Sequence, residues 1–107
     1  MSDRRDVRVT REFFEQVDRL LPAERAGVTP SRSDFQASDL LTIVDTFRTR
    51  WDDLPFYVPG RTEWRVLITT GRLVPYLEVV GELALDGGID LVLISIDLSW
   101  PEAAEDS

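Results

Sequence analysis

The sequence predicts an α+β fold in which two helices pack on a small antiparallel sheet. Apolar residues recur with a helical period in two segments before residue 55, and after residue 60 they alternate with a period of two. The alternating part contains Asp86-Gly87-Gly88, a strong signal for a hairpin turn. A chain of 107 residues has room for one domain. We place that domain at residues 1–98 and expect the acidic segment 99–107 to be a disordered tail.

The first predicted elements are a short strand at residues 7–9 and a helix that follows it directly. Val7-Arg8-Val9 has strand-like alternation, and Thr10 is a favourable helix cap. Pro22 ends the helix. Its predicted apolar face consists of Phe13, Phe14, Val17, Leu20 and Leu21.

A loop at residues 22–34 precedes the second helix, for which two starts fit the sequence. Ser33 and Gln36 have the spacing of a capping box, whereas Ser38 directly precedes the apolar run. We expect an irregular lead-in and a main helix near residues 38–53, closed by Pro55, with Asp39 and Asp45 on its solvated side. Its predicted apolar stripe is Leu40, Leu41, Val44, Phe47, Trp51 and Leu54.

After a linker at residues 55–60, three strands are predicted to form a meander. The first alternates around Trp64-Arg65-Val66-Leu67-Ile68 and turns at Thr70-Gly71. The second covers residues 73–83, where Pro75 and Gly81 favour a bulge or an edge position. The third covers residues 89–98 and has apolar residues on both faces, which predicts a strand that is central or buried on both sides.

The residue inventory excludes several kinds of chemistry. The chain has no Cys and no His, and all 12 of its basic residues are Arg. Nucleophilic catalysis with a His base, Schiff-base catalysis and a phosphate-binding loop with Lys therefore cannot occur. The carboxylate pairs Asp52-Asp53 and Asp86 with Asp90 lack the oxygen-rich loop that Ca²⁺ needs. We predict no catalytic residues, no metal and no cofactor.

The net charge of −8 arises in the last third of the chain, because residues 73–107 contain eight acids and no base. Such a surface makes nucleic acid an unlikely partner and fits a basic protein partner, although the acids could also serve solubility alone. No apolar run is long enough to cross a membrane, and the N-terminal residues are polar. We therefore expect a cytoplasmic protein.

Two groups of residues are candidates for partner binding. Arg61, Arg65 and Arg72 form a basic segment that could contact nucleic acid phosphate or an acidic protein surface, or could pair internally with acids such as Glu78 or Glu82. The aromatic candidates are Tyr57, Trp64, Tyr76 and Trp100. Trp51 lies on the helical stripe and is predicted to belong to the core.

The sheet-forming segments resemble the C-terminal sheet of the RelE/ParE superfamily of bacterial toxins. The resemblance rests on Trp64-Arg65-Val66-Leu67-Ile68, on Leu73-Val74 with Tyr76, and on Gly88-Ile89-Asp90-Leu91-Val92 with Ile94. It implies a toxin of a toxin-antitoxin system, with a cognate antitoxin and a gyrase-like or ribosomal target as partners. Ribosome-dependent RNA cleavage occurs in this superfamily, but it requires a general base and cations, and this chain has neither His nor Lys. We therefore expect action by protein contact.

Two alternatives remain open at the level of sequence. One is an acidic immunity or inhibitor-like module that neutralises a basic protein, as the charge distribution suggests. The other is a non-catalytic dimerising domain in which residues 73–83 form an exposed edge strand joined to a second copy.

Overall fold

The computed structural model describes residues 5–27, 29–71 and 73–97. Two helices of ten or more residues and a five-stranded sheet make up the α+β fold that the sequence predicts. The elements in chain order are β1 (Val7–Val9), α1 (Arg11–Leu20), α2 (Arg32–Ala37), α3 (Asp39–Arg50), the single 3₁₀ turn η1 (Trp51–Asp53), β2 (Phe56–Val58), β3 (Arg61–Thr69), β4 (Tyr76–Leu83) and β5 (Ile89–Asp97).

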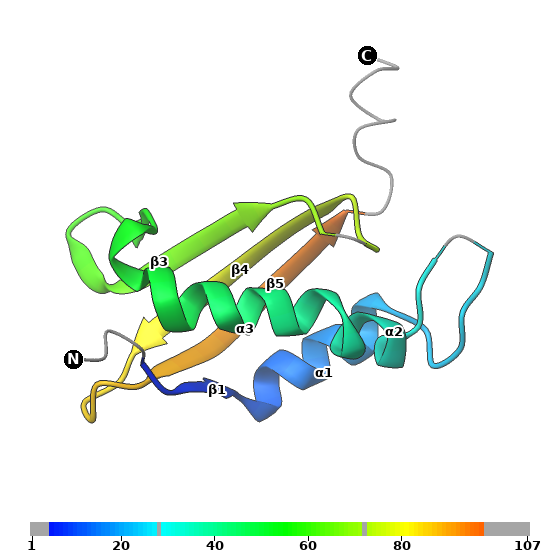
Figure 1. Cartoon of the computed structure of the whole chain (residues 1–107), viewed down its shortest axis with the longest axis horizontal. Helices are drawn as coiled ribbons and strands as arrows, with labels where there is room; N and C mark the ends of the chain where they lie inside the picture. The colour runs from blue at the N-terminus through cyan, green and yellow to red at the C-terminus, as the bar shows by residue number, and fades with distance from the viewer. Residues whose placement is uncertain (1–4, 28, 72, 98–107) are drawn as a thin grey trace, which may run out of the picture.

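The strand order in the sheet is β1-β5-β4-β3-β2. Figure 1 shows β3, β4 and β5 side by side. The predicted meander of β3, β4 and β5 is confirmed, with antiparallel pairing throughout. However, β1 pairs with β5 in parallel, so the sheet is mixed rather than antiparallel. The strand β2 was predicted as part of a linker. It forms because Gly60, with φ +85°, turns the chain back so that Phe56 lies opposite Arg65.

The strand β4 lies between β3 and β5, so the prediction of an exposed dimerising edge at residues 73–83 is wrong. A bulge does lie at Gly81, but its extra residue is on β5 rather than on the strand for which it was predicted: Val80 pairs with Leu93 and Gly81 with Leu91, which leaves Val92 without an opposite residue. The predicted hairpin turn is confirmed, with φ +88° at Gly87.

The helix α1 lies alongside the free edge of β5, beyond the point where β1 ends. Its predicted cap is confirmed, because the Thr10 side chain accepts a hydrogen bond from the Phe13 N–H. Gln16 extends the edge pairing with its side-chain amide, which donates to the Val92 carbonyl at 2.8 Å and accepts from the Ile94 N–H at 3.0 Å. A side chain thus replaces a strand at this edge and shields it from further pairing.

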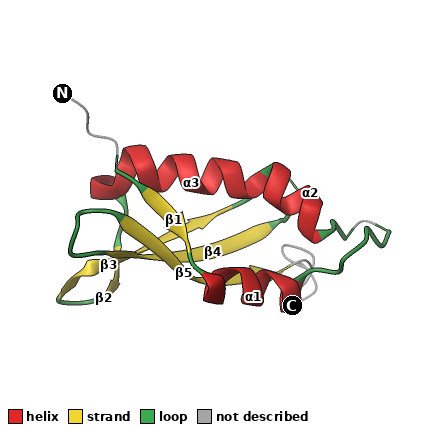
Figure 2. Ribbon diagram, turned by 90° about the horizontal axis from the view of Figure 1, so that it is seen from below, coloured by secondary structure: helices red, strands yellow, loops and turns green. Residues whose placement is uncertain are grey.

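The second helical region differs from the predicted one at its start. Ser31 and Asp34 form the capping box of the short helix α2, rather than Ser33 and Gln36. The helix α3 follows at once and crosses one face of the sheet (Figure 2). Leu41 was predicted to face the core but is exposed, and Ile43 is buried.

The core lies between this helix and the sheet face that it covers. Trp51 is buried there, as predicted. The strand β5 was predicted to be central or buried on both faces. It lies between β1 and β4 in the sheet, and Leu93 on the face away from the core is exposed. The buried core residues are Phe13, Val17, Leu21, Phe35, Leu40, Ile43, Phe47, Trp51, Val74, Leu77, Val79, Ile89, Leu91 and Ile94. No helix in the described ranges is long and apolar enough to span a membrane.

Candidate functional site

The sheet has a second face that α3 does not cover, and the strand register determines which side chains lie on it. Residues facing the core alternate along β3, β4 and β5 with residues that face away from it. We call this second surface the open face. It consists of Trp64, Val66 and Ile68 on β3, of Tyr76, Glu78, Val80 and Glu82 on β4, and of Asp90, Leu93, Ser95 and Asp97 on β5.

An apolar line crosses the middle of the open face. Val66 pairs with Val80, which pairs with Leu93 on the next strand. Val66 and Val80 are only 7% and 2% exposed, although neither belongs to the main core. By contrast, Leu93 is 40% exposed and Ile68, two residues from Val66, is 55% exposed. The exposed apolar surface of this face therefore comes from Leu93, at one end of the line, and from Ile68, beside its other end.

Carboxylates lie on both sides of this apolar line. Glu82 pairs with Trp64 and Asp90 on one side, and Glu78 pairs with Ile68 and Ser95 on the other. Tyr76 pairs with Asp97 at the end of the strands. The residues of β3, β4 and β5 on the open face include four carboxylates and no basic side chain.

One cation lies next to the open face, on β1. The Arg8 side chain donates to Asp90 at 2.7 Å and to Asp86 at 2.7 Å. The hydrogen bond from Arg8, together with one from the Gly88 N–H, lowers the pKa of Asp86 to about 2. Arg8 therefore offsets the negative charge of Asp86 and Asp90. The Glu78 and Glu82 carboxylates, by contrast, form no ion pair with a described residue.

Aromatic side chains lie at opposite ends of the open face. The Tyr57 ring stacks on the Trp64 ring with 6.5 Å between centroids. The Tyr76 hydroxyl donates to the Glu78 carboxylate at 3.2 Å. Desolvation and the negative charge of Glu78 raise the pKa of the Tyr76 phenol, so Tyr76 stays neutral and can donate hydrogen bonds through the physiological range. The fold thus brings three of the four predicted aromatic residues to this side of the sheet.

The predicted arginines lie elsewhere. Arg61 forms an ion pair with Glu63 at 2.6 Å, on an exposed part of β3. Neither Arg61 nor Arg65 pairs with Glu78 or Glu82, so this part of the internal-pairing alternative is wrong. Arg72 and Trp100 lie outside the described residues. Partner contact by Arg61 stays a prediction.

Arg65 on β3 links the sheet to the end of the helical region by hydrogen bonds. Its Nη1 donates to the carbonyls of Trp51, Asp52 and Leu54 at 3.0–3.2 Å. The guanidinium also lies over the rings of Trp51 and Phe56, at 5.3 and 4.7 Å from the centroids. These carbonyls lie at the negative end of α3 and η1, so a cation is stabilising there. The contacts give Arg65 a structural role, and partner contact by this residue stays a prediction.

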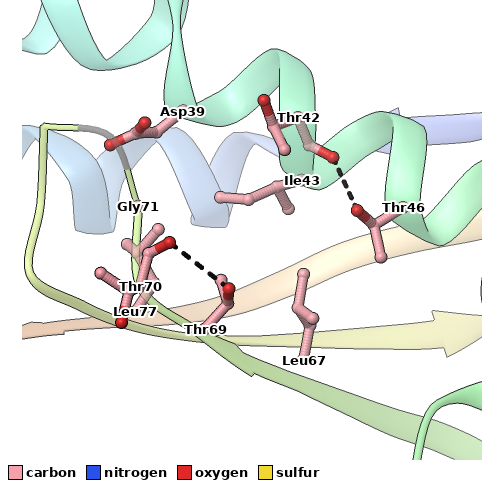
Figure 3. A pocket seen from close by; sticks show the side chains of 9 residues that line it. All are labelled: Asp39, Thr42, Ile43, Thr46, Leu67, Thr69, Thr70, Gly71 and Leu77. Carbon is pink, nitrogen blue, oxygen red and sulfur yellow. Dashed lines mark hydrogen bonds between the residues drawn. The ribbon is translucent and has the colours of Figure 1, made fainter.

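A cavity of about 180 Å³ opens between α3 and the end of β3 (Figure 3). Beside it lies Asp39, which was predicted to be solvated but is only 3% exposed. Its Oδ2 accepts from the Leu73 N–H at 2.9 Å and the Val74 N–H at 3.2 Å. Asp39 therefore holds the connection between β3 and β4. The cavity is lined by Asp39, Thr42, Ile43, Thr46, Leu67, Thr69, Thr70, Gly71 and Leu77.

The side chains of the open face are suited to binding a partner. Its carboxylates can accept hydrogen bonds from cations and its aromatic and aliphatic side chains can be buried by a partner. No cluster of three or more acidic side chains in the described ranges is arranged to hold a metal ion. From the sequence, Glu78 and Glu82 were predicted as pairing partners for arginines and as members of the acidic last third of the chain. Their positions two residues either side of Val80, in an alternating strand, could have placed both on one face.

Comparison with protein families, with curated proteins and with solved structures found no match to this chain.

Proposed function

We propose that this protein is a protein-binding module that neutralises a partner by covering a basic surface of it with the open face. The observation that carries the proposal is the combination of exposed Leu93 and Ile68 with Glu78 and Glu82, which form no ion pair with a described residue, on a sheet face that no described helix covers. Exposed apolar side chains supply free energy when a partner buries them. The carboxylates select a partner of opposite charge and speed its association. The protein would act in the cytoplasm.

The test uses the full chain as bait for cytoplasmic proteins at low and high salt. Glu78→Lys combined with Glu82→Lys reverses the charge of the open face, whereas Glu12→Lys combined with Asp45→Lys makes the same change on exposed positions of the helices. We expect wild type and the helix variant to retain the same basic proteins, and the open-face variant to lose them. Retention should weaken as salt shortens the Debye length from about 10 Å at 0.1 M to about 3 Å at 1 M. Equal capture by both variants would contradict the proposal.

A second candidate is a toxin-like protein that acts by contact with an antitoxin and a cellular target. The meander β3-β4-β5 favours it, since this is the part of the fold whose sequence carries the resemblance. Expression of the chain alone in bacteria should then arrest growth, and co-expression of a neighbouring antitoxin gene should restore it. Normal growth during expression of folded protein would reject this candidate.

A further inference from the structure

The open face has a geometry that restricts the shape of its partner. The apolar line of Val66, Val80 and Leu93 runs across the strands rather than along them. On β4, Glu78 and Glu82 lie on either side of this line. They are four residues apart, which at about 3.3 Å per residue separates their Cα atoms by about 13 Å.

The sign of the charge excludes several occupants. A second copy of this chain would bring carboxylates against carboxylates, and nucleic acids and anionic membrane surfaces carry the same negative charge. The C-terminal residues 98–107 contain three acids and no base, so they do not complement the open face electrostatically either. Charge complementarity therefore points to a cationic segment of another protein.

The spacing of the carboxylates decides between an extended and a helical segment. An extended segment turns only every second side chain toward the sheet, in a single line. It can cover the apolar line or one row of carboxylates, but not all three lines together. A helix is about 10–12 Å wide and can present an apolar stripe with cations along both of its borders. Its width matches the separation of about 13 Å between Glu78 and Glu82.

We infer that the open face binds an amphipathic basic helix of its partner, lying across β3, β4 and β5. This inference rests on the proposed function and specifies the partner's binding element. The apolar stripe of the helix covers Leu93, and on the Glu78 side the helix also covers Ile68, which lies opposite Glu78. Arg or Lys side chains on one border reach Glu78, and those on the other border reach Glu82. The end of the partner's helix that lies over β3 contacts Trp64 rather than a carboxylate. We therefore expect the Arg or Lys side chains of that helix to lie over β4 and β5.

The test compares two synthetic peptides of identical composition, about 16 residues each and built from Leu, Arg, Ala and Gln. In one peptide Leu recurs with helical spacing and Arg borders the Leu stripe; in the other Leu and Arg alternate with a period of two. Each is titrated into the full-length protein, with the affinity measured by calorimetry and the peptide conformation by circular dichroism. We expect the helical peptide to bind at least tenfold more tightly and to gain helicity on binding.

Protein variants locate the binding. Glu78→Gln combined with Glu82→Gln should weaken the binding of the helical peptide by about 2- to 30-fold, which is the range expected for the loss of two partly exposed ion pairs. Leu93→Ser should also weaken it, whereas Leu41→Ser, on the exposed side of α3, is the matched control and should not.

Equal binding of the two peptides would overturn the helix inference, and so would failure of both to bind. The proposed function would survive either result if the bait experiment still showed loss of basic proteins from the Glu78→Lys and Glu82→Lys variant. Undiminished binding of the helical peptide to the Glu78→Gln and Glu82→Gln variant would overturn the inference as well, because the cations would then not lie at these carboxylates.

Discussion

Replacing Asp39 by Ala should destabilise the protein more than the loss of any other acid on α3. The carboxylate is 3% exposed and accepts hydrogen bonds from the N–H groups of Leu73 and Val74. Hydrogen bonds to charged groups contribute about 1.5–3 kcal/mol each, and an orphaned buried donor costs about 1–3 kcal/mol. Val74 is fully buried, so loss of the hydrogen bond from its N–H lowers the free energy of unfolding by about 2 kcal/mol. The N–H of the more exposed Leu73 can bind water instead, so loss of its hydrogen bond costs about 1 kcal/mol. We expect a total of about 3 kcal/mol.

Chemical and thermal unfolding measure this effect. A loss of about 3 kcal/mol in a domain of this size lowers Tm by about 12–24 °C. Asp45→Ala is the control, because Asp45 is an exposed acid on the same helix, and it should change the free energy of unfolding by less than about 0.5 kcal/mol.

A double-mutant cycle that combines Asp39→Ala with Gly71→Ala tests whether the Asp39 carboxylate lies against residue 71. A Cβ at residue 71 would lie 2.6 Å from the Asp39 Oδ2 and 2.9 Å from its Cγ, so Gly71→Ala should cost about 2 kcal/mol in the wild-type chain. Once Asp39 is Ala, those two atoms are gone and only Leu77, at 3.0 Å, restricts the new methyl group. We expect a coupling of about 1–2 kcal/mol. Additivity within about 0.5 kcal/mol, or equal effects of Asp39→Ala and Asp45→Ala, would refute the reasoning.

Three further predictions concern other parts of the fold. Arg65→Ala should lower the free energy of unfolding by about 2–3 kcal/mol because three carbonyls lose their donor, whereas Arg61→Ala should stay within about 0.5 kcal/mol in the same urea titration. Gly81→Ala should cost about 1–3 kcal/mol, since its Cβ would lie 2.7 Å from the Phe47 ring; a Tm equal to that of wild type would contradict this. The pKa of Asp86 is about 2, below its ordinary value, so its ion pair stabilises the fold above about pH 4 and is lost as the pH falls through 2. The stability difference between wild type and Arg8→Met should therefore shrink over that range, and a constant difference would be evidence against this ion pair.

Parts of the candidate site could be predicted from the sequence, because a strand assigns alternate residues to opposite faces. The alternation around Trp64 and Val66 is visible in the sequence, and so is the concentration of acids after residue 72. The sequence did not reveal that Trp64 lies opposite Glu82 rather than Glu78. That pairing follows from the register of β3 against β4, which the connection held by Asp39 fixes.

The roles of Asp39 and Arg65 could not be predicted, since both depend on contacts between residues far apart in the chain. Helical periodicity placed Asp39 on a solvated face, but its carboxylate meets backbone N–H groups 34 and 35 residues further along. Arg65 was interpreted as part of a basic surface, but its guanidinium meets carbonyls 11 to 14 residues earlier. Sequence periodicity does not show which group a charged side chain will contact. Whether such a side chain is buried is therefore decided only when the elements pack.

The sequence by itself determined the elements that local chemistry specifies. The cap at Thr10 and the turn at Gly87 follow from hydrogen bonds and backbone preferences within a few residues. The apolar periods fixed the helices and the meander in the same way. Tertiary structure alone decided that β1 lies parallel to β5, that β2 joins the sheet, and that one face of the sheet stays open. These features depend on which distant backbone edges and side chains meet, and the free energy of such contacts arises only after the chain has closed the loops between them.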